Sequence, residues 1–278
     1  MSGFPQLNAE EYTDLGNNFG RQGNYEEAMR MYGLALQVDP YYARAHYCAA
    51  YLLTLVGDHE EAVKGYDRAI HINNNYVDAY VNKANSLKAL GRHREALKAC
   101  DQALRFEPYA SDIHASRGAM LSALGRHKEA LEAENKALQY DPQNALAYFN
   151  KGVVLIALGK YKDALSVFNY GLQINSQDPD IYKMMAVAYI LLDQNSNAFR
   201  VLHTALQLTN TDPMIFVLQG LVYLNQREPG QAGDEFIKAL GAVSTRQDID
   251  RVKQVVDAIY KYERQGIKVK SYIGGLLE

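Results

Sequence analysis

The sequence predicts an all-α solenoid, in which pairs of antiparallel helices repeat along the chain. The first observation is a repeated segment: ALGRHREALKACDQAL (89–104) and ALGRHKEALEAENKAL (123–138) match at 11 of 16 positions, 34 residues apart. Periods of about 20 to 50 residues are typical of solenoids. The second observation is that apolar residues recur at helical intervals, broken by glycine and proline, and not in the alternation of strands.

Counted from Ala9, seven units of 34 residues follow one another without insertions and predict a single solenoid domain. The units are 9–42, 43–76, 77–110, 111–144, 145–178, 179–212 and 213–246. Repeat position 20 is alanine in all seven units, and position 8 is always glycine or alanine. Small residues at both positions predict that the two helices of a unit approach closely.

Within each unit, positions 1–14 and 18–31 carry helical periodicity, so each unit is predicted to form two helices. Position 15 is glycine in five units: Gly23, Gly57, Gly91, Gly125 and Gly159. Glycine allows the chain to leave the first helix and reverse into the second. Position 32 is proline in three units: Pro40, Pro108 and Pro142. Proline ends the second helix because it has no N–H to donate.

This pattern resembles the tetratricopeptide repeat family. The matching residues of the first unit are Gly16, Tyr25, Ala28, Tyr32, Ala35 and Pro40, and the seven units cover 238 of 278 residues. The resemblance implies a right-handed superhelix whose first helices line a concave groove and whose second helices form the outer surface. Repeats of this kind stabilise one another through neighbour contacts and need a polar cap at the end.

Residues 247–278 are expected to supply that cap as a helix followed by a tail. Helical spacing relates Ile249, Val252, Val256 and Ile259. Thr245 and Asp248 form a candidate capping pair at the start of this helix. Residues 1–8 are expected to be a frayed N-terminal extension.

Composition narrows the function classes. The net charge of −3 does not favour nucleic acid, which usually requires a basic surplus. Cys48 and Cys100 lie far apart in the sequence and are expected to be free thiols. The longest apolar run, Met184–Leu192, is too short to cross a bilayer, and the N-terminus does not read as a signal peptide. We therefore expect a cytoplasmic protein without a transmembrane segment.

Two motifs look chemical but have structural explanations. The stretch Gly152–Lys160 has the wrong glycine spacing for a phosphate-binding loop, and no Ser or Thr follows the lysine. Three histidines, His59, His93 and His127, recur at repeat position 17. Packed helices lie about 8–10 Å apart, whereas zinc ligands must all lie about 2 Å from one ion. We expect no catalytic residues, no metal and no cofactor.

Glu134 breaks the repeat pattern. It occupies position 24, where four other units have Tyr32, Tyr66, Phe168 and Phe236. A buried carboxylate needs a partner or a proton, and packing of positions 4 and 24 would bring His114 to it. We expect a contact between Glu134 and His114. The alternative is that Glu134 extends its carboxylate to solvent.

Helical geometry places positions 2, 6, 9 and 13 on the concave side of the superhelix. Positions 6 and 9 give the candidate partner-binding residues, which turn from polar to apolar along the chain: Asn17, Tyr51, Asn82, Asn85, Asn150, Val153, Met184, Val187, Leu218 and Leu221. Asparagine amides can pair with any peptide backbone. The apolar C-terminal half is expected to be an interface. The alternative is that the superhelix, the cap helix or the tail covers it and makes it core.

The sequence therefore predicts a non-catalytic scaffold or adaptor that binds a peptide or an amphipathic helix of a protein partner in its concave groove. Carboxylate-clamp members of the family, which hold chaperone C-terminal tails, are not matched, because Cys48 and Asp78 stand at two of the clamp positions. One alternative is a self-assembling homo-oligomer that uses the apolar C-terminal groove. Another is the targeting subunit of an enzyme complex, which would use the same groove.

Overall fold

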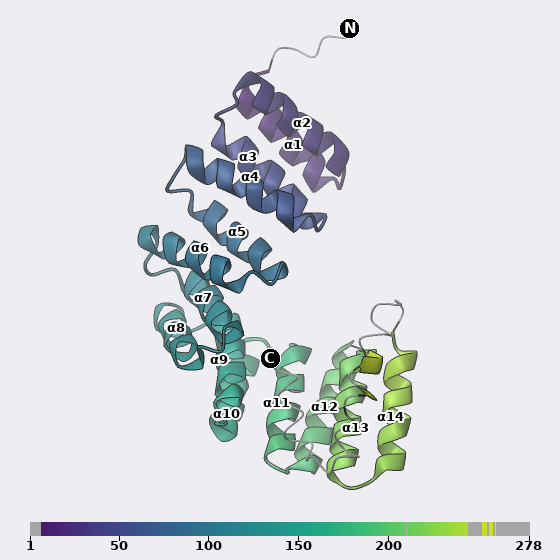
Figure 1. Ribbon diagram of the computed structural model, residues 1–278. Coiled ribbons are helices and arrows are strands. Elements are labelled where there is room, and N and C mark those ends of the chain that lie inside the picture. Colours follow the sequence, from purple (N-terminus) through teal and green to yellow (C-terminus); the bar gives the residue numbers. More distant parts are fainter. Residues whose placement is uncertain (1–6, 210, 244–251, 255, 258, 260–278) are drawn as a thin grey trace. The chain divides into compact units, whose positions relative to one another are not determined.

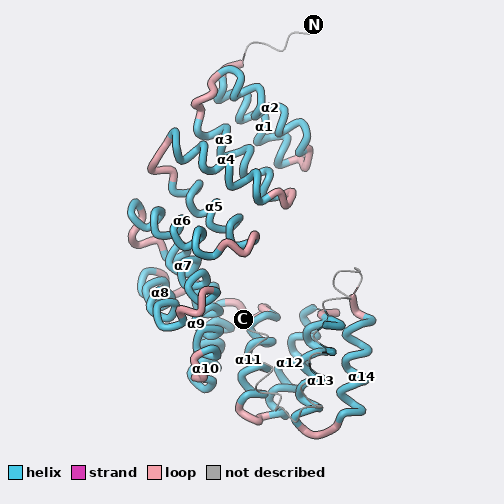
Figure 2. The backbone as a smooth tube through the Cα atoms, viewed as in Figure 1, coloured by secondary structure: helices cyan, strands magenta, loops and turns pink. Residues whose placement is uncertain are grey.

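The computed structural model describes residues 7–209, 211–243, 252–254, 256–257 and 259, and it confirms the all-α solenoid of helix pairs (Figures 1 and 2). Residues 9–241 contain fourteen helices, the described positions between 252 and 259 are helical as well, and no strand occurs among the described residues. The helices are α1 (Ala9–Arg21), α2 (Tyr25–Val38), α3 (Ala43–Leu55), α4 (His59–Ile72), α5 (Val77–Ala89), α6 (His93–Phe106), α7 (Ser111–Ala123), α8 (His127–Tyr140), α9 (Ala145–Ala157), α10 (Tyr161–Ile174), α11 (Pro179–Leu191), α12 (Asn195–Thr209), α13 (Pro213–Asn225) and α14 (Pro229–Gly241). No helix in the described ranges is both long and apolar enough to cross a membrane.

The chain divides into two compact units, Met1–Arg126 and His127–Glu278. The division falls between α7 and α8. In a solenoid each repeat contacts only its neighbours, so no single core spans the chain. We call these the N-terminal unit and the C-terminal unit.

The first helix begins at a capping box. The backbone N–H of Glu11 donates to Asn8 Oδ1 at 2.9 Å, and the backbone N–H of Asn8 donates to Glu11 Oε2 at 2.8 Å. The two residues thereby satisfy two backbone donors that a helix start leaves unpaired. This local device fixes where α1 begins.

Small residues let the two helices of a pair pack closely, as predicted. A Cβ placed on Gly16 would lie 2.5 Å from the ring of Tyr32, and one on Gly152 would lie 2.2 Å from the ring of Phe168. Gly220 meets Phe236 in the same way, at 2.3 Å. The aromatic ring at position 24 therefore packs directly on the glycine at position 8, and this contact allows the two helices of the pair to pack closely.

Side chains at position 4 make a contact that the repeat pattern did not predict. Tyr80 and Tyr182 each donate their hydroxyl to the carbonyl six residues earlier, at 3.3 Å. The Nε2 atom of His46 lies 2.9 Å from the carbonyl of Pro40. These side chains thus hold the loop that enters the first helix, because that loop has carbonyl groups without helical partners.

Consecutive first helices contact one another within each unit. In the N-terminal unit α1 contacts α3 and α3 contacts α5, and in the C-terminal unit α9 contacts α11 and α11 contacts α13. This arrangement places these first helices side by side in a row, and we call the side of the row that carries positions 6 and 9 the inner face. The candidate groove residues at positions 6 and 9 all lie on these helices.

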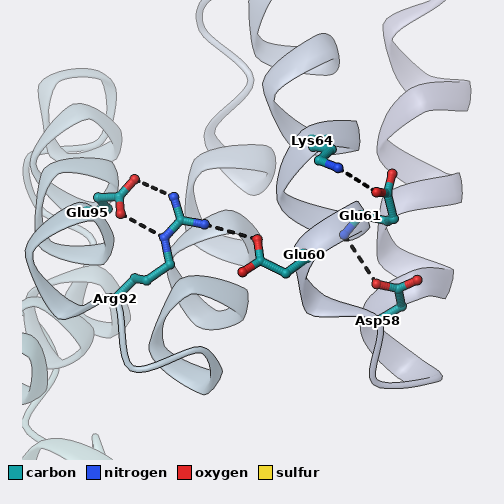
Figure 3. Close-up of polar contacts among 6 residues, drawn as sticks. All are labelled: Asp58, Glu60, Glu61, Lys64, Arg92 and Glu95. Carbon is teal, nitrogen blue, oxygen red and sulfur yellow. Dashed lines mark hydrogen bonds and ion pairs between the residues drawn. The ribbon is translucent and has the colours of Figure 1, made fainter.

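Ion pairs also join successive repeats on the outer side of the N-terminal unit (Figure 3). The guanidinium of Arg92 donates to both oxygens of Glu95, at 2.7 and 2.6 Å, and to Glu60 Oε2 of the preceding repeat at 3.1 Å. Lys64 pairs with Glu61 at 2.6 Å beside this network. Exposed ion pairs typically contribute less than about 1 kcal/mol each, so they fix register more than stability.

Part of the predicted cap falls within the described residues. The described positions between 252 and 259 are helical, and Val252, Val256 and Ile259 are buried in the core of the C-terminal unit. Several other predictions concern residues outside the described ranges. These residues are Ile249, the capping pair Thr245 and Asp248, the tail, and residues 1–6.

Candidate functional site

The polar part of the predicted groove lies on α1, α3 and α5 of the N-terminal unit. Asn17 and Asn82 are half-buried, whereas Asn85 is exposed. Tyr51 on α3 is 45% exposed. All four residues are therefore accessible from the inner face, as a binding surface requires.

Tyrosine hydroxyls fix the orientation of two of these asparagines. Tyr32 donates its hydroxyl to Asn17 Oδ1 at 2.8 Å, and the Asn17 amide nitrogen hydrogen-bonds the Cys48 thiol, which leaves one of its two N–H groups available as a donor. Asn82 Nδ2 donates to the hydroxyl of Tyr47 at 2.9 Å, so the Oδ1 atom of Asn82 stays available as an acceptor. The two side chains therefore present a donor on α1 and an acceptor on α5. An extended peptide backbone offers groups of both kinds.

Three tyrosine rings stack between α3 and the start of α5. The ring centroids of Tyr47 and Tyr51 are 6.4 Å apart, and those of Tyr47 and Tyr76 are 4.9 Å apart. Burial, followed by the charge of Asp78, raises the pKa of Tyr47 to about 12. The Tyr47 hydroxyl therefore stays protonated at neutral pH and can accept from Asn82 while donating elsewhere.

Around the tyrosine stack the basic residues form ion pairs, whereas one acidic residue does not. Arg44 donates to Asp14 at 2.8 Å, and Lys83 pairs with Asp67 of the preceding repeat. Asp78 is exposed and forms no ion pair with any described residue. Cys48 lies half-buried beside Asn17, and burial raises the pKa of its thiol, so it is not an activated nucleophile.

The apolar half of the predicted groove is largely core. Val187, Leu218 and Leu221 are only 3%, 2% and 0% exposed. They belong to the same hydrophobic cluster as the cap residues Val252, Val256 and Ile259. The sequence left open whether this surface is an exposed interface or is covered and part of the core. These three residues are part of the core. Val153 and Met184 are half-buried and pack against the same cluster.

Glu134 on α8 is completely buried, which contradicts the alternative that it reaches solvent. Neither carboxyl oxygen has a partner at normal hydrogen-bond distance and angle among the described residues, but the Asn150 amide lies near enough to affect the pKa of the carboxyl group. Burial raises the pKa of Glu134 to about 9, against the smaller lowering effects of the Asn150 amide and the Lys151 charge. The side chain is therefore protonated and neutral at pH 7.

The predicted contact of Glu134 with His114 would join the two units and stays a prediction. The Nε2 atom of His114 lies 2.9 Å from the carbonyl of Pro108, the position-4 contact seen in other repeats. Asn150, the last groove asparagine, is half-buried on α9.

Sequence reasoning missed two members of the stack, Tyr47 and Tyr76. Tyr47 occupies position 5, beside the groove stripe, and Tyr76 is the last residue before α5. Tyrosines four residues apart at 47 and 51 were the available signal, because residues at that spacing share one face of a helix.

Comparison with known proteins agrees with the repeat pattern. Models described as tetratricopeptide repeat match residues 13–77, 77–109 and 145–178, and a model described as TPR repeat matches residues 118–159. No curated protein is a match to this chain.

Solved structures share the fold at low identity. A tetratricopeptide repeat protein from Parabacteroides merdae is 20% identical, with a TM-score of 0.75 over 88% of this chain and 96% of that one. The Cut9–Hcn1 structure of the APC/C is 18% identical, with a TM-score of 0.68 over 88% of this chain and 46% of that one.

YrrB, described as a TPR protein with an unusual peptide-binding site, is 23% identical, with a TM-score of 0.52 over 66% of this chain and 95% of that one. The matched repeats and the shared fold agree with the helix pairs described above. The chain belongs to the tetratricopeptide repeat family.

Proposed function

We propose that this protein is a non-catalytic interaction scaffold that binds an extended peptide segment of a partner protein along α1, α3 and α5. The observation that carries the proposal is the pair of asparagines held by tyrosine hydroxyls. Asn17 keeps one amide N–H group available, and Asn82 keeps its amide oxygen available. A partner backbone can satisfy both without depending on its own side chains.

Preorganisation supports this use of the groove. A side chain that is already held by a neighbour loses less conformational entropy when a ligand binds. Tyr32 and Tyr47 hold the amides of Asn17 and Asn82 before any partner arrives. The exposed ring of Tyr51 adds apolar area between them.

Burial in the C-terminal unit weighs against self-assembly through the apolar groove. That alternative needs Val187, Leu218 and Leu221 to be accessible, and all three are buried. A targeting subunit of an enzyme complex would use the N-terminal groove and is a special case of the same proposal.

The test is selection of binders from a random library of 12-residue peptides displayed on phage, with the full chain as bait. Affinities of enriched peptides would then be measured by fluorescence polarisation. We expect Asn17→Ala and Asn82→Ala each to weaken binding about tenfold, the usual effect of losing one ligand hydrogen bond.

The matched control is Asn135→Ala, an exposed asparagine on the second helix α8. It should leave peptide affinity unchanged. A library that yields no binder, or binders indifferent to both groove substitutions, would contradict the proposed function.

A further inference from the structure

The surface shared by α3 and α5 presents aromatic ring faces and hydrogen-bond acceptors, and the cations beside it are already paired with carboxylates. We call it the α3–α5 patch and define it as Tyr47, Tyr51, Tyr76, Asp78 and Asn82. The two helices contact each other directly. Tyr51 and Asp78 are exposed, and the other three members are half-buried. None of the five is therefore fully buried within the N-terminal unit.

The aromatic members provide ring faces. Tyr51 is 45% exposed and stacks on Tyr47 with an interplanar angle of 20°. Tyr76 also stacks on Tyr47, with an interplanar angle of 30°. The face of an aromatic ring carries partial negative charge and attracts ammonium and guanidinium groups.

The polar members of the patch are acceptors. Asn82 uses its amide nitrogen on the Tyr47 hydroxyl, which leaves Oδ1 as the group available to a ligand. Asp78 precedes Asn82 by four residues on α5, so the two side chains lie on the same face one turn apart. The Asp78 carboxylate lies in the first turn of α5, where it interacts favourably with the helix dipole. It is exposed and has no ion-pair partner among the described residues.

Neighbouring cations are already committed. Arg44 on α3 pairs with Asp14 of the preceding repeat, and Lys83 on α5 pairs with Asp67. Lys88 follows Asp78 by ten residues, which is about 15 Å along a helix. The carboxylate of Asp78, the amide oxygen of Asn82 and the tyrosine faces thus form an acceptor surface that lacks its own cation.

We propose that the α3–α5 patch binds a basic side chain of the partner peptide, with arginine preferred over lysine. The guanidinium plane would lie against the tyrosine stack and its N–H groups would donate to Asn82 Oδ1, while the Asp78 carboxylate one helical turn away supplies the opposite charge. Arginine fits better because its planar group stacks on rings and donates in two directions at once. This inference rests on the proposed function, since it names the residue that the groove selects.

The same phage library tests it. We expect the binders that depend on Asn17 to share an arginine at one position. The decisive measurement replaces that arginine by citrulline, which keeps the shape and removes the charge. Affinity should fall about tenfold, and the loss should shrink as salt rises, because screening weakens charge interactions.

Protein variants provide the second measurement. Asp78→Asn and Tyr51→Leu should each weaken the arginine peptide about three- to tenfold and weaken the citrulline peptide clearly less. Glu10→Gln, which removes an exposed carboxylate at the same repeat position on α1, is the charge-matched control and should have no effect. Circular dichroism of each variant checks that it is folded.

The outcomes separate the two proposals. Binders that need Asn17 but lack a basic residue, or that tolerate citrulline, would overturn the arginine site and leave the peptide groove standing. A library without groove-dependent binders would overturn both.

Discussion

The inner faces of the two units present the same helix positions to opposite environments. At repeat position 9, Tyr51 in the N-terminal unit is 45% exposed, whereas Leu221 in the C-terminal unit is fully buried. At position 6, Asn82 is half-buried and Leu218 is buried. The comparison teaches that a position in a repeat sets which face a residue lies on, but not whether that face meets solvent or core.

The largest expected effect comes from placing a carboxylate at position 9 of each unit. Leu221→Asp should lower the free energy of unfolding of the C-terminal unit by more than about 4 kcal/mol, because it removes buried apolar area and buries a charge. Tyr51→Asp should change stability by less than about 1 kcal/mol. Urea denaturation followed by circular dichroism measures both.

Similar losses for the two variants would mean that the inner faces do not differ in burial. Tyr51→Phe serves as the conservative control in the N-terminal unit, because it keeps the ring and its stacking on Tyr47.

The second effect concerns position 24, which is aromatic in Tyr32 and Tyr66 of the N-terminal unit and is Glu134 at the start of the C-terminal unit. Burial raises the pKa of Glu134 from 4.5 to about 9. Between these values the unfolded chain ionises this carboxyl and the folded chain does not. The contribution of Glu134 to stability is therefore fully present below pH 4.5 and falls as pH rises towards 9.

Glu134→Gln should remove this pH dependence and stabilise the protein at pH 7 by about 3 kcal/mol, the product of about 2.5 pKa units and 1.36 kcal/mol per unit. The measurement is the difference in unfolding free energy between the wild type and the variant at several pH values. A difference that stays constant from pH 5 to pH 8 would show that Glu134 is already ionised in the folded state.

A third, smaller effect compares the turns within the helix pairs. Gly57 in the N-terminal unit has a φ of 86°, while Arg227 in the C-terminal unit adopts a φ of 64°. The left-handed region disfavours residues with a Cβ. Gly57→Ala should lower the unfolding free energy by about 1 kcal/mol, and Arg227→Gly should raise it by about 0.5–1 kcal/mol.

Melting temperatures of the two variants provide the measurement. If Arg227→Gly lowers the melting temperature, contacts of the arginine side chain outweigh its backbone strain.

The smallest effect is expected on the outer surface of the N-terminal unit. Arg92→Met removes the ion pairs with Glu60 and Glu95 while keeping the aliphatic part of the side chain. The unfolding free energy should fall by less than about 1 kcal/mol, and the difference from the wild type should disappear in 1 M NaCl. A large, salt-independent loss would indicate that Arg92 acts through packing instead.

The sequence alone determined the repeat and its helices, because both follow from local rules. Glycine at position 15 permits the turn, and apolar spacing of 3 to 4 residues builds each helix face. It also predicts that Asn17, Tyr51, Asn82 and Asn85 share one face of the first helices, since one helical phase governs every unit. The tilt of position 4 towards the preceding loop, as in Tyr80, was not predicted, because loop carbonyls leave no mark in periodicity.

Only the tertiary structure decided which groove residues are accessible and how their polar groups are turned. Leu221 is core because it belongs to the hydrophobic cluster of the C-terminal unit, which also includes cap residues such as Val256 and therefore joins segments far apart in the chain. Asn82 presents its oxygen because Tyr47, 35 residues earlier, takes its amide nitrogen. Helical phase is a local property that a sequence carries in its spacing, whereas burial and hydrogen-bond direction depend on which distant residues the fold brings into contact.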